Sequence, residues 1–187
     1  MMSTSSSVHT NKGYREFPCA LDNGAFGCWR RGFPFMSDNF RKQISAAHKS
    51  GVTLDFITCP DIVAGGERSL QFSMDWATGE LRSAPRLALV VQDGMGEHMV
   101  SYQHPEQWFS HIFVGGTKAW KWRTAEAWVK YAHGKGMKCH IGQCGRLEYL
   151  REAKRIGADS VDSTSFAVND SWHIVEEFYQ GPSLGLF

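Results

Sequence analysis

The chain has 187 residues, a length that suits one domain with a sizeable hydrophobic core. Its 20 basic and 19 acidic residues give a formal net charge of +1, which excludes the strongly basic field of a protein that coats nucleic acid non-specifically. No apolar run approaches the ~18–20 residues of a membrane span, and the N-terminus lacks a signal-peptide core. We therefore expect a cytoplasmic protein without a membrane partner.

The first segment, MMSTSSSVHTNKG, is polar and rich in Ser and Thr. We predict a disordered tail over residues 1–15 and a single β/α domain over residues 16–187. The five cysteines are odd in number and form no CxxC pair, which indicates reduced thiols rather than a secreted disulfide framework.

Six apolar runs along the chain each end in small polar or acidic residues. They lie at 19–26, 54–63, 86–95, 111–117, 138–144 and 160–166. Near-continuous runs of Val, Ile and Leu are typical of parallel strands that are buried on both faces. In parallel β/α folds the loops after the strands converge on one face, where substrates bind.

Polar stretches with helical spacing alternate with these runs. We predict helices at 36–50, 66–77, 118–134, 146–156 and 170–179, and a loop with a short helix at 97–109. In the most regular helix, the candidate buried stripe consists of Trp120, Ala127, Trp128 and Tyr131. Closed barrels of eight β/α units usually need roughly 200–250 residues. The predicted fold class is therefore α/β, a TIM-barrel-like set of parallel β/α units in a short or incomplete barrel, with room for one more element before Asp22.

The ends of the six runs carry side chains that suit one shared site. Those expected there are Asp22, Asp61, Gln92, Asp93, Gly115, Gly116, His140 and Asp162. Asp159 and Asp162 are three residues apart, so strand alternation turns them to opposite faces, and Asp162 lies nearer the carboxyl end. Two carboxylates across a cleft are the groups that glycosidic-bond chemistry uses. On spacing alone, the alternative that these aspartates only form turns stays open.

Basic and aromatic residues mix at two places beside the predicted mouth of the site. The basic ones are Arg30 and Arg31 after the first run, and Lys118, Lys121 and Arg123 after the fourth. Such mixtures suit phosphates and unstacked bases, so these five are candidates for nucleic-acid binding. The alternative is a solvated helix face with tryptophans in the core. For His140 the alternatives are a core histidine and a contact to the sugar-phosphate.

Five segments resemble motifs of the tRNA-guanine transglycosylase family, in the family's order. LDNGAF resembles the family's DSGGF strand end, VVQDGM resembles IVQGG, and FVGGTKAWK resembles GGLAVGE. GADSVDSTSF resembles the segment G-x-D-x-x-D-C-V, and CPDIV resembles the FDE strand end. The likeness covers roughly residues 19–166 and extends to the small phage-encoded relatives that place 7-deazaguanines in DNA. A phage protein of this kind would work in the cytoplasm of its host.

The resemblance implies an enzyme that replaces guanine in nucleic acid by a 7-deazaguanine, and it favours DNA over tRNA as the substrate, with tRNA left open. It implies that Asp162 is the nucleophile of a covalent glycosyl-enzyme intermediate and that Asp22 transfers protons. The family's base contacts correspond to Asp61, Gln92, Gly115 and Gly116. Together with residues placed near them by the sequence, the expected substrate-binding residues are Asp61, Gln92, Asp93, Gly115, Gly116, Phe26, Met95 and His140. Of these, Phe26 and Met95 are candidates for stacking on the base and suit core packing equally well.

Some features depart from the tRNA enzymes. Their zinc subdomain, three closely spaced Cys plus a His, has no counterpart, and Cys139 and Cys144 around His140 do not supply one. We therefore expect neither a metal nor a cofactor. A guanine in duplex DNA must be flipped out or presented in a single strand. Because a short barrel exposes strand edges, we also expect a homo-oligomer or a partner subunit.

Two other functions stay open at this point. The first is a phosphate-binding β/α-barrel enzyme of different chemistry, in which Lys118 or Lys121 forms a Schiff base. The second is a non-catalytic subunit that binds nucleic acid or a base and assists a transglycosylase. The presence of both Asp22 and Asp162 favours an enzyme.

Overall fold

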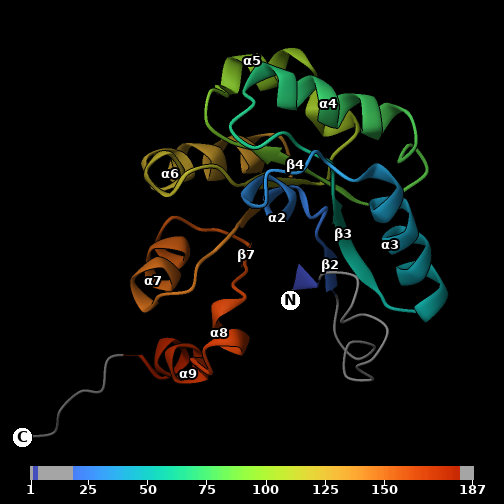
Figure 1. Cartoon of the computed structure of the whole chain (residues 1–187). Helices are drawn as coiled ribbons and strands as arrows, with labels where there is room; N and C mark the ends of the chain where they lie inside the picture. Colours follow the sequence, from blue (N-terminus) through green and yellow to red (C-terminus); the bar gives the residue numbers. More distant parts are fainter. Residues whose placement is uncertain (1, 4–18, 182–187) are drawn as a thin grey trace, which may run out of the picture.

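The computed structural model describes residues 2–3 and 19–181 of the chain, and their strands form one parallel sheet (Figure 1). The strands are β1 (Met2–Ser3), β2 (Cys19–Leu21), β3 (Leu54–Thr58), β4 (Leu87–Val91), β5 (His111–Val114), β6 (Lys138–Ile141) and β7 (Ser160–Val161). Their order in the sheet is their order in the chain, and every pairing is parallel. The sheet curls, but β1 and β7 are its two edges. The prediction of an α/β fold with an incomplete barrel is confirmed.

Helices connect the strands and cover the outside of the sheet (Figure 1). They are α2 (Ala25–Arg30), α3 (Ser37–Ser50), α4 (Glu67–Thr78), α5 (Glu97–Tyr102), the 3-10 turn η2 (Pro105–Gln107), α6 (Lys118–Gly134), α7 (Leu147–Arg155), α8 (Ser165–Val168) and α9 (Trp172–Gln180). The five helices predicted from the sequence are present with their ends shifted by at most two residues. Helix α2 was not predicted. The run at 19–26 is a strand only as far as Leu21, because Gly24, with φ of 78°, starts a helix at once.

The core lies between the outer face of the sheet and the helices. Strand β4 is buried along its whole length, which explains its unbroken apolar run. On α6 the buried positions recur every three or four residues, as expected for a helix with one face on the sheet. They include Lys121, Ala125, Trp128 and Ala132. Trp120 and Trp128 are buried as predicted, whereas Ala127 is exposed.

The inner face of the sheet carries a second cluster, formed by Ala20, Phe56 and Ala88 with Phe113 packed against it. Side chains of this face continue to the carboxyl ends of the strands. The inner face therefore forms the floor below the site described next.

The two ends of the chain add smaller elements. Of the predicted tail 1–15, only Met2 and Ser3 lie among the described residues, and they form β1, paired to Ala20 and Leu21. Strand β1 thus fills the place of one further element before Asp22. Helix α9 packs against α7. None of the helices within 19–181 is long and apolar enough to cross a membrane.

Candidate active site

A cavity of about 730 Å³ opens at the carboxyl ends of the strands. Loops after β2 through β7 all contribute to its lining, as expected for a parallel sheet whose strands end at one edge. The predicted site residues that line it are Asp22, Phe26, Arg30, Asp61, Gln92, Gly115, Gly116, Lys121 and Asp162. The volume lies in the range of sites that hold a small molecule or a single nucleotide.

The loops after β2, β3 and β4 form one side of the cavity, the β2–β4 wall, whose polar side chains include Asp22, Asn23, Asp61 and Gln92. Asn23 Nδ2 donates to Asp61 Oδ1 at 2.7 Å, and Gln92 Nε2 donates to Asp61 Oδ2 at 2.9 Å. Gln92 Nε2 also donates to Ser69 Oγ at 2.9 Å, while Gln92 Oε1 accepts from Ala64 N at 2.6 Å. Both amide protons of Gln92 are thus engaged within the protein. Gln92 lines the cavity as a support for Asp61.

Burial controls the ionisation of the two carboxyl groups on this side. It raises the pKa of Asp61 to about 6, although the hydrogen bonds from Asn23 and Gln92 act in the opposite direction. Burial also raises the pKa of Asp22, against the backbone amide of Gly24 and with help from the negative charge of Asp162. A carboxyl group that holds its proton more tightly than usual suits proton transfer near neutral pH.

The opposite side, the β5–β7 wall, is formed by Lys121, Gln143 and Asp162 with the backbone of Gly142. Asp162 Oδ1 accepts a hydrogen bond from Gln143 N at 2.6 Å. Gln143 has a φ of 62°, a left-handed conformation that is uncommon for a residue other than glycine and that often marks a functional loop. The side chain of Asp162 is 16 % exposed, and its Oδ2 makes no hydrogen bond with any described residue.

The pKa of Asp162 is shifted opposite to that of Asp22. Burial acts to raise it, but the imidazole of His140, the amide of Gln143 and the cation of Lys121 outweigh burial and lower the pKa of Asp162. Asp159 points elsewhere, as strand alternation predicted: its carboxylate bonds to His133 Nε2 at 2.8 Å and lies outside the lining. One cavity therefore holds two carboxyl groups whose environments push their pKa values apart.

His140 lies behind Asp162, in the core rather than in the cavity lining. Its ring stacks on Phe113 with centroids 4.7 Å apart and meets Phe56 edge-on at 5.4 Å. Nδ1 lies 2.8 Å from Ser160 Oγ, and Nε2 lies 3.6 Å from Asp162 Oδ1, too far for a strong hydrogen bond. Among the described residues Nε2 has no hydrogen-bond partner. The assignment of His140 to substrate binding is corrected to a core histidine that faces the carboxylate of Asp162.

Asp93 and Met95 are also corrected, because neither lines the cavity. Asp93 accepts hydrogen bonds from Thr117 N at 2.6 Å and from Thr117 Oγ1 at 2.7 Å, so it fastens the loop after β4 to the start of α6. Gly116, with φ of 76°, allows this contact, since a Cβ there would lie 2.6 Å from Asp93 Oδ2. Met95 is buried in the main core.

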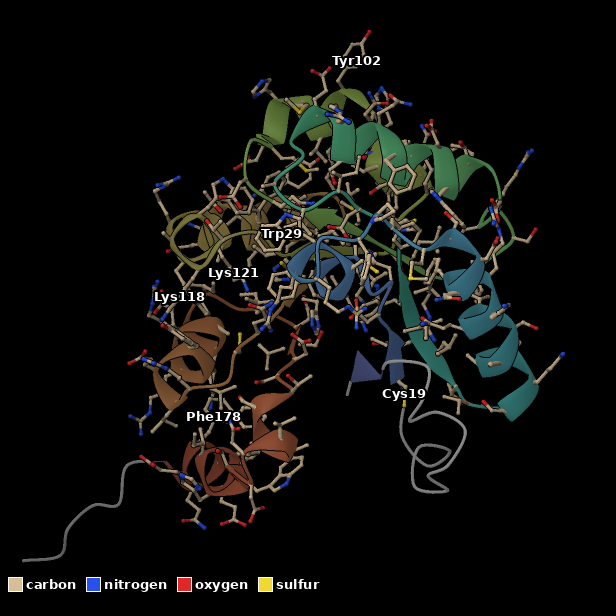
Figure 2. The ribbon with its side chains drawn as sticks, in the orientation of Figure 1. Cys19, Trp29, Tyr102, Lys118, Lys121 and Phe178 are labelled. Atoms are coloured by element: carbon tan, nitrogen blue, oxygen red, sulfur yellow. The ribbon has the colours of Figure 1, made fainter. Side chains whose placement is uncertain are left out.

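The predicted nucleic-acid-binding residues separate into three groups. Arg30 lines the cavity from α2. Arg31, Lys118 and Arg123 are exposed outside it. Lys121 is only 3 % exposed, which rules out the alternative of a solvated helix face for this residue, and its Nζ donates to Gly142 O at 2.5 Å. Figure 2 shows Lys118 between α6 and α7, where its Nζ lies 4.7 Å from the ring centroid of Tyr149, and Lys121 nearer the middle of the molecule.

Sequence reasoning missed several side chains that line the cavity, among them Gln143, Asn23 and Thr58. Asn23 donates to Cys59 O at 2.6 Å as well as to Asp61, and it accepts from Ala25 N at 2.7 Å. The Asn-Gly pair predicted a tight turn, and no local signal points to these long-range partners. Thr58 is buried at the end of β3 and lines the cavity. Its Oγ1 is buried and has no hydrogen-bond partner among the described residues.

Within residues 2–3 and 19–181, no group of three His, Cys, Asp or Glu side chains is arranged to hold a metal ion. Cys139 and Cys144 are separate buried thiols, and burial raises the pKa of each to about 12, far from the range of a reactive thiolate. No family model and no curated protein matches the chain. Fold and site together define an α/β protein with an open parallel half-barrel and a polar cavity at the carboxyl ends of its strands.

Proposed function

We propose that the protein is a base-exchange transglycosylase, which replaces guanine in nucleic acid, DNA rather than tRNA, by a 7-deazaguanine. The observation that carries the proposal is the pair of Asp22 and Asp162 in one cavity, with pKa shifts of opposite sign. The likeness of LDNGAF and GADSVDSTSF to segments of the tRNA-guanine transglycosylases supports the same division of roles.

In the first half-reaction, Oδ2 of Asp162 attacks C1′ of the target nucleotide. Gln143 N–H holds Oδ1, and the lowered pKa of Asp162 keeps the carboxylate ionised for attack. The C1′–N9 bond breaks, the bonding electrons leave with guanine, and the departing base takes the proton of Asp22. The products are a glycosyl ester on Asp162, neutral guanine and an ionised Asp22.

In the second half-reaction, a 7-deazaguanine occupies the place of guanine. Ionised Asp22 takes the proton from N9 of this base while N9 attacks C1′, and the bond from C1′ to Asp162 breaks. Asp162 is released as a carboxylate and Asp22 is protonated again. Atoms and charge balance, and the sugar has exchanged one base for the other.

The base is held by the β2–β4 wall in this proposal. Each carboxylate oxygen can accept more than one hydrogen bond, so Asp61 can accept from the N1–H and the 2-amino group of guanine while it keeps Asn23 and Gln92. The backbone at Gly115 and Gly116 allows a flat ring to approach closely. Phe26 and Arg30 line the mouth, where a flipped nucleotide would enter.

The test is Asp162→Asn with single-stranded DNA that contains guanine. The wild type should form a covalent protein–DNA adduct that survives a denaturing gel and should exchange labelled guanine, whereas the variant should lose both by about 10³-fold or more. Asp159→Asn is the matched control, because Asp159 lies three residues earlier and outside the cavity. It should form the adduct at wild-type yield.

Two results would overturn this proposal. One is an undiminished adduct in Asp162→Asn. The other is an adduct that borohydride reduction traps on Lys121, which would identify a Schiff-base enzyme instead.

A further inference from the structure

The part of the cavity that α7 and α8 form has no role in the exchange mechanism. Its lining side chains include Arg146 and Tyr149 at the start of α7, and Thr164 and Asn169 at the two ends of α8. These four residues make up the α7–α8 end of the cavity. The strands β2 and β7 stand near opposite edges of the sheet, so this end lies away from the β2–β4 wall (Figure 1).

The polar groups of the α7–α8 end use little of their bonding capacity within the protein. Thr164 and Asn169 are exposed, and neither side chain makes a hydrogen bond with a described residue. Arg146 is 66 % exposed, and among the described residues it forms an ion pair only with Glu148, with Nη1 3.4 Å from Oε1. Exposed ion pairs contribute little, so an anionic ligand can take the place of Glu148. A guanidinium with a hydroxyl and an amide beside it is a set of donors that suits a phosphate.

The charges in the cavity lining separate in the same direction. Asp22 and Asp61 follow β2 and β3, and a phosphate on that side would meet their carboxylates. Asp162 adds a further negative charge at the reacting atom. Like charges repel strongly where water is excluded, so a phosphate beside Asp162 needs a cation at short range. Arg146 supplies that cation in the α7–α8 end.

A second cation stands next to this end, outside the cavity. Lys118 Nζ lies 4.7 Å from the ring centroid of Tyr149, and Trp122 stacks on Tyr149 with centroids 4.9 Å apart. The contact with the aromatic ring holds the exposed ammonium of Lys118 at the rim of the cavity. Arg146 and Lys118 thus form a basic path that leads from the cavity to the surface between α6 and α7 (Figure 2). A chain of phosphates can follow such a path.

The proposed reaction determines which part of a nucleotide reaches the α7–α8 end. C1′ must lie at Asp162 while the base lies on the β2–β4 wall. The two phosphates of a nucleotide in a strand are attached at C3′ and C5′, on the side of the sugar away from the base. The backbone therefore extends from Asp162 away from the β2–β4 wall, which is the direction of α7 and α8.

We propose that the α7–α8 end binds a phosphate that flanks the target nucleotide. Arg146 makes the charged contact, and Thr164 and Asn169 donate to the remaining phosphate oxygens. Lys118 faces the next phosphate along the strand, so the nucleic acid leaves the cavity between α6 and α7. The inference rests on the proposed function, since it assigns a backbone site to the nucleic acid of that reaction.

The experiment measures binding of single-stranded DNA that contains one guanine, by fluorescence anisotropy. In one strand every linkage is a phosphodiester. In two others a neutral methylphosphonate replaces the linkage on the 5′ or on the 3′ side of the guanine. The full chain carries Asp162→Asn in every sample, so that no adduct forms and binding is read alone. This parent protein should bind the unmodified strand about 10-fold more tightly than one of the two modified strands.

Arg146→Gln in the same parent tests the charged contact. It should weaken binding of the unmodified strand about 10-fold, and it should bind the sensitive modified strand within about 2-fold of the parent. The slope of log affinity against log salt should fall by about 1. Arg151→Gln is the matched control, because Arg151 lies on the same helix, pairs with Glu177 and is outside the cavity lining. It should bind all three strands as the parent does.

Two further variants separate a specific contact from a general effect of charge. Glu148→Gln removes the carboxylate that competes with the phosphate for Arg146, so it should tighten binding of the unmodified strand by about 2-fold. Lys118→Gln should weaken binding of all three strands alike, by about 3-fold, because Lys118 faces a different phosphate.

Equal affinity of the parent for all three strands would overturn the inference. So would an equal loss for all three strands in Arg146→Gln, which would limit Arg146 to the overall field of the protein. Adduct formation is read separately, in the chain that keeps Asp162. An adduct without any effect of the methylphosphonates refutes the phosphate site and leaves base exchange standing. A methylphosphonate effect without an adduct refutes base exchange and leaves the phosphate site standing.

Discussion

The two walls of the cavity differ in how completely their polar groups are already bonded. In the β2–β4 wall, Asn23, Asp61 and Gln92 bond to one another, and every amide proton of Asn23 and Gln92 has an acceptor. In the β5–β7 wall, Lys121 and Asp162 keep unused hydrogen-bonding capacity. A fully bonded buried network is rigid and sets a shape. A ligand or a reacting atom gains most binding free energy from groups that are not yet bonded within the protein. The β2–β4 wall therefore suits recognition, and the β5–β7 wall suits chemistry.

The largest expected effect of breaking the β2–β4 wall is on stability. Asp61→Ala leaves the amides of Asn23 and Gln92 buried without their shared acceptor, and we expect a loss of about 3–5 kcal/mol in the free energy of unfolding. Urea denaturation measures it. Asp162→Ala removes a single acceptor, that of Gln143 N, and should cost clearly less. Equal losses would show that the walls do not differ.

The pH dependence of stability sharpens the same contrast. The folded-state pKa of Asp61 is about 6, above its unfolded value of 3.8, so its contribution is fully present below the unfolded pKa and is lost as the pH rises through about 6. Between pH 4 and 7 the advantage of the wild type over Asp61→Asn should therefore shrink by roughly 2–3 kcal/mol. His111 titrates in both proteins, so the comparison cancels its contribution. A constant difference across this range would contradict the raised pKa of Asp61.

On the β5–β7 wall we expect His140 to act as a positioning residue for Asp162. His140→Phe keeps the stacking on Phe113 but removes the ring nitrogens. Since the imidazole lowers the pKa of Asp162, the acid limb of adduct formation should move to higher pH, with a loss of roughly 10-fold in rate on that limb. His111→Phe changes another buried histidine, at the far end of β5, and should leave the pH profile in place. If the acid limb of the pH profile does not shift in His140→Phe, His140 serves only in packing.

The sequence predicted the positions of Asp22, Asp61 and Asp162 better than that of Lys121. Parallel strands end at one edge, so the acidic ends of three apolar runs had to bring Asp22, Asp61 and Asp162 together, and the cavity lining contains all three. Lys121 was predicted to bind nucleic acid because basic residues alternate with tryptophans there. Its spacing from Ala125 and Trp128 is the signal that places it on the buried stripe. The partners of Asn23 come from other loops, and no periodicity encodes them.

The mouth of the cavity belongs to neither wall, and we expect a substitution there to have the smallest effect, on the affinity for DNA. Trp29 on α2 is 55 % exposed and stacks on Phe26 with ring centroids 5.8 Å apart (Figure 2). An exposed aromatic pair beside Arg30 suits a base next to the flipped nucleotide, so Trp29→Ala should weaken binding of single-stranded DNA by roughly 3–10-fold. Fluorescence anisotropy with a labelled oligonucleotide measures this. Tyr102→Ala removes an exposed aromatic ring on α5, far from the mouth, and should bind as the wild type does. If both variants lose affinity alike, DNA binds to the surface in general and does not enter the cavity at the mouth beside Trp29.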